Sequence, residues 1–185
     1  MNTHIMIDIE TLALDDNAVV TSFGAVAFNK KGFIEPTETA EIYRELPIQA
    51  QLNAGRIIEA KTLNWYQSKK LEIPPACFNL EYWRLGDHLK DLHHFIVEFF
   101  EEEQPALYIW SHGVCFDITK LQNLFKQYYD YVPWEYWQIM DCRTLVNLWP
   151  QAKLTASEDA SHNALEDARD QVKWLLALNK ELNFL

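Results

Sequence analysis

The first third of the chain alternates apolar and polar side chains with the two-residue period that is typical of β-strands. In the first stretch Ile5, Ile7 and Ile9 share one face, while Asp8 and Glu10 share the other. The expected strands are residues 3–9, 19–28 and 33–46, with a turn at 29–32 and an interruption at Pro36. We therefore predict three consecutive antiparallel strands.

Helical spacing dominates the rest of the chain. Leu85, Leu89 and Leu92 belong to one apolar stripe, and similar stripes run through residues 118–128 and from about Asn163 onward. Further short helices are expected at 48–54, 62–70 and 144–149, and further strands at 106–110 and 138–140. Because the run at 106–110 is continuously apolar, it is typical of a central strand covered on both faces. Together these elements predict an α/β fold with a mixed central sheet flanked by helices.

Length and composition indicate one domain. The 185 residues contain no linker rich in Gly, Ser or Pro and no repeat, so we expect residues 1–185 to form a single domain. No stretch approaches the roughly 20 apolar residues of a membrane span, and the N-terminus lacks a signal pattern. We therefore expect a soluble, cytoplasmic protein without a membrane partner. The three cysteines stand at unrelated spacings and predict neither a disulfide framework nor a zinc site.

The net charge of −11 argues against tight, non-specific binding of duplex DNA through many phosphates. An acidic protein can still hold one strand end through bound metal ions, which invert the local sign of the charge. The charge therefore favours short or single-stranded ends.

Four carboxylates and one imidazole form the most informative set of polar residues. Two carboxylates next to each other at the end of an apolar strand repel, so that either the pKa of one rises and it takes up a proton, or both stay ionised around a bound cation. Oxygen ligands of this kind suit Mg²⁺ or Mn²⁺. The candidate metal ligands are Asp8, Glu10, Asp117 and Asp167, and the candidate general base is His162.

This set matches the needs of phosphodiester hydrolysis with two metal ions, in which one ion prepares the water and the other stabilises the leaving oxygen. If Asn163 caps the last helix, His162 falls just outside it, and an imidazole suits the removal of a proton from the attacking water. Each residue also has an ordinary alternative. Asp117 could be a helix cap, Asp167 a solvated helix residue and His162 a surface loop residue.

Three motifs resemble those of the DEDDh, or DnaQ-like, 3′-to-5′ exonucleases. The motifs are residues 8–12 (Asp-Ile-Glu-Thr-Leu), Phe116-Asp117 and His162-x4-Asp167, in this order along nearly the whole chain. Residues 22–26, 62–68, 110–113 and 141–145 are most similar to the small branch with the phage DexA exonuclease and a mycobacterial exoribonuclease. One position departs from that branch, which usually has Asn where this chain has His112.

The resemblance implies a ribonuclease-H-like fold with a five-stranded mixed sheet, three strands antiparallel and then two parallel. It also implies two Mg²⁺ or Mn²⁺ ions, release of nucleoside 5′-monophosphates from the 3′ end of single-stranded RNA or DNA, and often a homodimer. By the same resemblance, four further residues would contact the terminal nucleotide, with Leu12 as a wedge and Trp65 by stacking. These substrate-binding residues are Thr11, Leu12, Trp65 and Phe116.

Two other functions fit the same sequence. A non-catalytic module that binds nucleic acid or a partner would keep the fold and bind without turnover. A ribonuclease-H-like endonuclease would release internal fragments instead of mononucleotides. The aromatic residues between 128 and 137 could stack on bases, but they suit a subunit interface slightly better.

Overall fold

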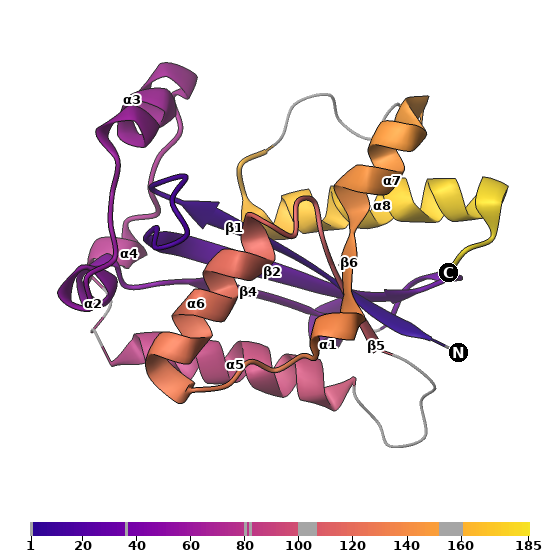
Figure 1. The fold of residues 1–185 in the computed structure, drawn as a ribbon, viewed down its shortest axis with the longest axis horizontal. Coiled ribbons are helices and arrows are strands. Elements are labelled where there is room, and N and C mark those ends of the chain that lie inside the picture. The colour runs from indigo at the N-terminus through magenta and orange to yellow at the C-terminus, as the bar shows by residue number, and fades with distance from the viewer. Residues whose placement is uncertain (1, 36, 80, 82, 100–106, 152–160) are drawn as a thin grey trace.

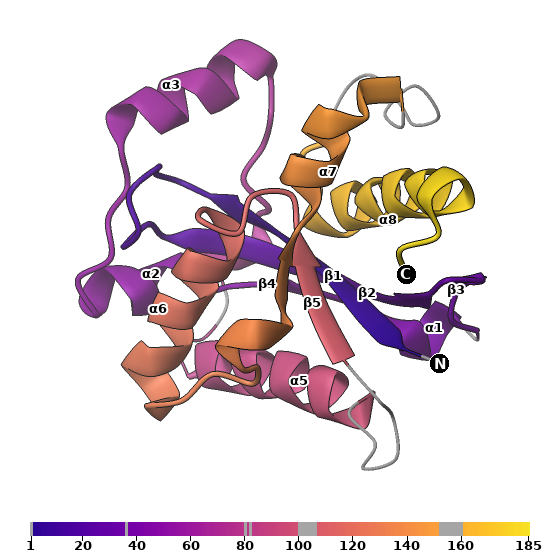
Figure 2. The same cartoon turned by 45° about the vertical axis from the view of Figure 1, so that its right-hand side comes forward.

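The fold is a central β-sheet with helices on both faces, as Figures 1 and 2 show. The computed structural model describes residues 2–35, 37–79, 81, 83–99, 107–151 and 161–185. Ala106, the first residue of one predicted strand, and Pro36 lie outside these residues.

Within the described part of the chain, the sheet has six strands and mixes both directions. Its main path runs in the order β3-β2-β1-β5-β6, and β4 also pairs with β2. β1 pairs antiparallel with β2 and parallel with β5, and β5 pairs parallel with β6. The strands are β1 (Thr3–Thr11), β2 (Val20–Asn29), β3 (Gly32–Phe33), β4 (Glu41–Glu45), β5 (Leu107–Ser111) and β6 (Ile139–Asp141).

The expected count of five strands was one too low, although the order of directions was right. The predicted strand at 33–46 divides into β3 and β4, with the short helix α1 (Thr37–Ala40) between them. β3 pairs with the end of β2 at Phe28, whereas β4 pairs with its earlier part, from Ser22 to Val26. Both pieces therefore lie along β2, and the chain leaves the sheet only between them.

The two faces of β1 pack against different helices. Ile5, Ile7 and Ile9 belong to the core under α5 (Arg84–Glu98) and α6 (Asp117–Tyr129). Met6 belongs to the core under α7 (Cys142–Leu148) and α8 (Ala164–Leu182). Because side chains alternate along a strand, Asp8 and Glu10 lie on the same face as Met6. The alternation predicted for β1 is confirmed.

A third, smaller cluster of buried residues lies at the far end of β1. Leu12, Val19 and Tyr66 pack there with residues of α2 (Ile48–Asn53) and α4 (Ala76–Asn79). Tyr66 comes from α3 (Ala60–Lys69), which Figure 2 shows beyond this end of the sheet. The short 3₁₀ helix η1 (Tyr136–Gln138) precedes β6. Among the described residues, no helix is long and apolar enough to cross a membrane.

Candidate active site

Asp8 and Glu10 enter the site from the end of β1. Asp8 lies opposite Gly24 of β2, and Glu10 lies opposite Ser22. The pairing with β2 shifts by one residue between Glu10 and Thr11, and such irregularities are common where a strand presents side chains to a site. Both carboxylates therefore lie on the face that α8 covers.

Gly24 lets the start of α8 lie directly on the sheet. A Cβ atom at this position would stand 2.3 Å from the backbone nitrogen of Leu165 and 2.4 Å from its Cα atom. Only glycine permits this approach, because any side chain would collide with the helix backbone. Since Gly24 pairs with Asp8, the contact brings the first turn of α8 beside Asp8.

The first turn of α8 fixes His162 and Asp167. The side chain of Asn163 caps the helix and accepts hydrogen bonds from the backbone N–H groups of Leu165 (3.1 Å) and Glu166 (3.2 Å). His162 lies just before the cap in the left-handed region at φ 52°. The backbone N–H and the hydroxyl of Ser161 both donate to Oδ1 of Asp167 at 2.9 Å. The predicted helix start, with His162 just outside it, is confirmed.

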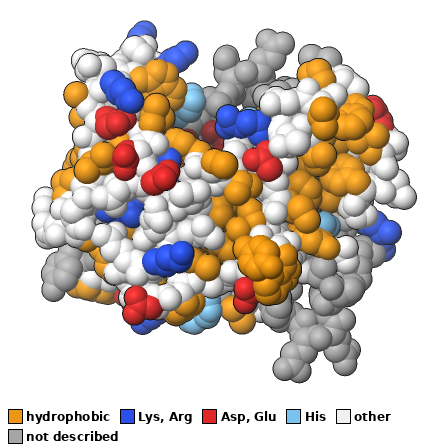
Figure 3. Space-filling view, in the orientation of Figure 1, with side chains coloured by type: hydrophobic (Ala, Val, Ile, Leu, Met, Phe, Trp, Pro, Cys, Tyr) orange, Lys and Arg blue, Asp and Glu red, His pale blue; other side chains and the backbone are white. Residues whose placement is uncertain are grey.

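Three of the predicted residues converge closely. One ligand atom each from Glu10, His162 and Asp167 lies within 4.8 Å of the others. Figure 3 shows the region between α3 and α7, where histidine, acidic and basic side chains gather. The carboxylate of Asp8 is close enough to interact electrostatically with Glu10, Asp117 and Asp167. The structure therefore brings all five predicted residues into one neighbourhood.

Burial and mutual repulsion favour protonation of Asp8, Glu10 and Asp117. Burial, followed by the charge of Asp167, raises the pKa of Glu10 to about 7, and a hydrogen bond from Tyr66 partly opposes this. Burial also raises the pKa of Asp117 to about 7, although the positive charges of Arg143 and Lys120 oppose the rise. The pKa of Asp8 is raised well above its ordinary value by burial first, and then by Asp117 and Glu10. Without a cation, this cluster holds protons near neutral pH.

The cluster fits divalent cations that prefer oxygen ligands. Several buried carboxylates repel one another when ionised, and a cation of charge +2 among them removes that repulsion. Asp8, Glu10, Asp117 and Asp167 are the residues that could hold such ions. The imidazole of His162 lies at the edge of the cluster, where it could take a proton from a water molecule.

Several neighbours of the cluster were not predicted from the sequence. Gln171 donates from Nε2 to Oδ1 of Asp8 at 2.7 Å, and the hydroxyl of Tyr66 donates to Oε2 of Glu10 at 3.2 Å. Gln171 lies four residues after Asp167, on the same side of α8, and this spacing could have identified it. Tyr66 comes from α3, and its contact depends on tertiary packing that no local pattern reveals.

The predicted substrate residues differ in their accessibility. Trp65 is 40 % exposed, and its ring meets the ring of His162 edge-on, with 5.0 Å between the centroids. Phe116 is half-buried. The hydroxyl of Thr11 donates to the carbonyl oxygen of Ala13 at 2.9 Å, and Leu12 is buried in the small cluster at the end of β1. A role for Leu12 as a wedge therefore stays a prediction.

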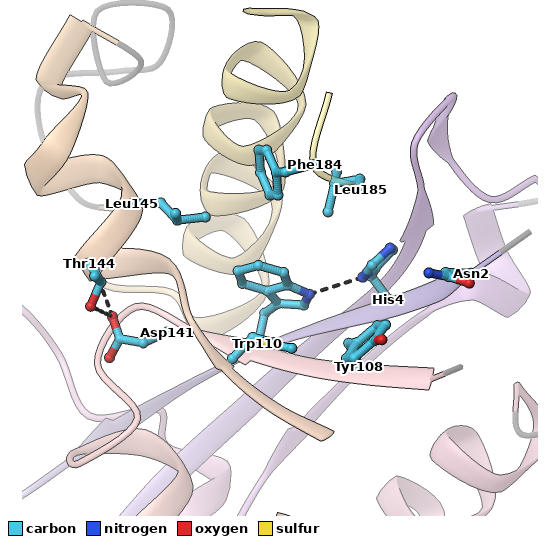
Figure 4. Close-up of a pocket in the computed structure, with 10 residues that line it drawn as sticks. Asn2, His4, Tyr108, Trp110, Asp141, Thr144, Leu145, Phe184 and Leu185 are labelled. Carbon is cyan, nitrogen blue, oxygen red and sulfur yellow. Dashed lines mark hydrogen bonds between the residues drawn. The ribbon is translucent and has the colours of Figure 1, made fainter. Parts of the chain in front are cut away.

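A separate pocket of about 410 Å³ lies near the start of β1 (Figure 4). Its lining includes Tyr108, Trp110 and Phe184, and none of the five predicted site residues. Trp110 donates from Nε1 to Nδ1 of His4 at 3.1 Å. Burial lowers the pKa of His4 to about 4, so this histidine is neutral at pH 7.

Solved structures with the same fold include exonucleases and nuclease domains. The S. pombe Pop2p structure, a form with bound Mg²⁺ and Mn²⁺, has a TM-score of 0.62 at 11 % identity, covering 96 % of this chain and 82 % of Pop2p. The nuclease domain of 3′hExo, a DEDDh family member bound to rAMP, has a TM-score of 0.61 at 12 % identity, covering 97 % and 92 %. The E. coli ExoI–ssDNA complex with zinc has a TM-score of 0.66 at 14 % identity, covering all of this chain but 42 % of ExoI. These likenesses confirm the predicted ribonuclease-H-like exonuclease fold.

The sequence comparison identifies the family. No curated protein sequence matches this chain. The model of the 3′-5′ exoribonuclease Rv2179c-like domain matches residues 3–178, which include every residue of the candidate site. The resemblance to 3′-to-5′ exonucleases is thereby confirmed, whereas the narrower likeness to phage DexA stays a prediction. The chain belongs to the Rv2179c-like 3′-5′ exoribonuclease domain family and is a 3′-5′ exonuclease.

Proposed function

We propose that this chain removes nucleoside 5′-monophosphates from the 3′ end of single-stranded RNA or DNA. The observation that carries the proposal is the meeting of four carboxylates from β1, α6 and α8 with the imidazole of His162, just before α8. These elements are far apart in the sequence, and the packing at Gly24 brings the start of α8 beside β1. Residues 1–185 act as one exonuclease domain in this proposal.

Asp8, Glu10, Asp117 and Asp167 hold two divalent cations, Mg²⁺ or Mn²⁺, in the proposed mechanism. When bound, the ions supply positive charge to the attacking and leaving oxygens of the phosphodiester. The donor set supports this assignment, because buried carboxylates with raised pKa values are stabilised by such ions. The Pop2p form with Mg²⁺ and Mn²⁺ supports the choice of metal.

His162 acts as the general base. The left-handed backbone of His162 and the Asn163 cap set the imidazole beside Glu10 and Asp167 without making it part of the helix. From this position the imidazole takes the proton of the attacking water. The edge contact with Trp65 limits rotation of the ring.

The substrate is a single strand end. The net charge of −11 opposes a long phosphate-binding surface, so few nucleotides are held at a time. The exposed ring of Trp65 offers a stacking surface for the terminal base, and Phe116 lies next to the metal ligand Asp117. The ExoI complex with ssDNA and the 3′hExo complex with rAMP support single-stranded nucleic acid and a nucleoside monophosphate as ligands of this chain. A cytoplasmic location and a homodimer stay predictions.

The test is side-by-side digestion of three 5′-labelled substrates: single-stranded RNA, single-stranded DNA, and a duplex with a 3′ overhang. With Mn²⁺ or Mg²⁺ we expect a descending ladder from the single-stranded ends, mononucleotide products, and complete loss of activity in EDTA. Internal fragments would indicate an endonuclease. Metal and oligonucleotide binding without turnover would indicate a binding module.

A further inference from the structure

Lys120 is a buried positive charge beside the carboxylate cluster. It lies on α6 one turn after Asp117, and only 1 % of its surface is exposed. Burial of an ammonium group is unfavourable unless charges or hydrogen bonds replace its hydration. Lys120 takes part in none of the ion pairs between described residues, so its charge is balanced in another way.

The first balancing contact is with an aromatic ring. Nζ of Lys120 lies 3.5 Å from the centroid of the Phe116 ring. Residues four apart lie side by side on a helix surface, and a cation above a ring face is attracted by the electrons of the ring. Phe116 directly precedes Asp117, so the ammonium supports a ring at the edge of the site.

The second balancing contribution comes from nearby carboxylates. Burial lowers the pKa of Lys120, while the charges of Asp16, Asp117 and Asp15 oppose that change. Asp15 and Asp16 belong to the loop between β1 and β2, which α6 holds through a hydrogen bond from Nδ2 of Asn123 to the carbonyl oxygen of Asp16 at 3.2 Å. Lys120 therefore lies between this loop and the cluster, where it offsets negative charge without offering a metal ligand.

We propose that Lys120 is a positioning residue with two effects on the site: it holds the Phe116 ring in place for the terminal nucleotide, and its fixed charge lowers the affinity of the cluster for divalent cations. This inference rests on the proposed function. An apolar side chain of the same length would fill the same space without either effect, which separates this role from simple packing.

The experiment compares wild type with Lys120→Met and Lys120→Arg, and with Lys126→Met as a control on the exposed side of the same helix. Mn²⁺ affinity is measured by calorimetry, and kcat and KM are measured on a single-stranded oligonucleotide. At pH 8, above the pKa of about 7 that Glu10 and Asp117 have, removal of the charge in Lys120→Met should tighten Mn²⁺ binding at least about threefold, because a positive neighbour no longer repels the ions. Loss of the support for Phe116 should raise KM about two- to fivefold.

Lys120→Arg keeps the charge, so its Mn²⁺ affinity and its KM should stay within about twofold of wild type. The same is expected of Lys126→Met. Unchanged or weaker Mn²⁺ binding in a folded Lys120→Met variant would overturn the inference, and so would equal tightening in Lys120→Arg. If Lys120→Met does not fold, Lys120→Gln takes its place with the same expected sign. If the wild type binds Mn²⁺ and the variants bind it with the same affinity, this inference alone is refuted. A wild type that binds no Mn²⁺ refutes the proposed function as well.

Discussion

Replacement of Gly24 by alanine should disable the site without touching any candidate catalytic residue. The added Cβ atom would stand 2.3 Å from the nitrogen of Leu165, whereas an ordinary contact begins at 3.4 Å. The start of α8 must therefore move away from the sheet by about 1 Å, and it carries His162 and Asp167 with it. A misplacement of this size can lower a catalytic rate about 10²-fold.

The assay is kcat/KM on a 5′-labelled single strand, together with Mn²⁺ affinity and thermal unfolding. Overpacking of this kind costs typically about 1 to 3 kcal/mol, so the variant should fold with a lowered midpoint. Gly86→Ala is the matched control, because the new Cβ would meet only the hydroxyl of Tyr129, at 3.0 Å, far from the site. That control should keep nearly full activity. Activity of Gly24→Ala within threefold of wild type, with unchanged Mn²⁺ affinity, would refute the role of this contact.

Two further predictions concern proton transfer and pH. His162→Ala should lower the rate about 10² to 10⁴-fold while it largely spares Mn²⁺ binding, as expected for a lost general base, and normal activity would remove His162 from the mechanism. Because burial raises the pKa of Glu10 from 4.5 to about 7, the folded protein binds more protons than the unfolded chain between these values. The metal-free protein should therefore lose stability as pH rises from 5 to 8, by about 2.5 kcal/mol from Glu10 alone. Thermal unfolding in EDTA across this range measures the slope, and a stability that rises with pH would count against the raised pKa values.

The local parts of the site could be predicted from the sequence. Strand alternation alone sets Asp8 and Glu10 on one face of β1, and the helix cap at Asn163 sets His162 outside α8. Both features depend on residues that are close together in the chain. The meeting of the three motifs was inferred from the chemistry that four carboxylates and an imidazole serve together and from the resemblance to known exonucleases, because no local pattern reports a contact between β2 and α8.

The unpredicted parts all depend on tertiary packing. Gly24 stands in a strand where glycine is ordinarily unfavourable, and the reason for it becomes visible only when α8 is in place. Lys120 would be assigned to a solvated helix face from its charge, yet it is almost completely buried. Tyr66 reaches Glu10 across the fold. For Gly24 and Tyr66 the deciding neighbour is remote in the sequence.

The central claim is that the cluster of Asp8, Glu10, Asp117 and Asp167 is stabilised by divalent cations. Calorimetric titration of the wild type with Mn²⁺, in buffers of different ionisation enthalpy, tests it most directly. We expect two Mn²⁺ ions per chain, with release of protons at pH 6 that declines at pH 8, since the pKa values of Glu10 and Asp117 are raised to about 7. Absence of Mn²⁺ uptake at both pH values would contradict the account.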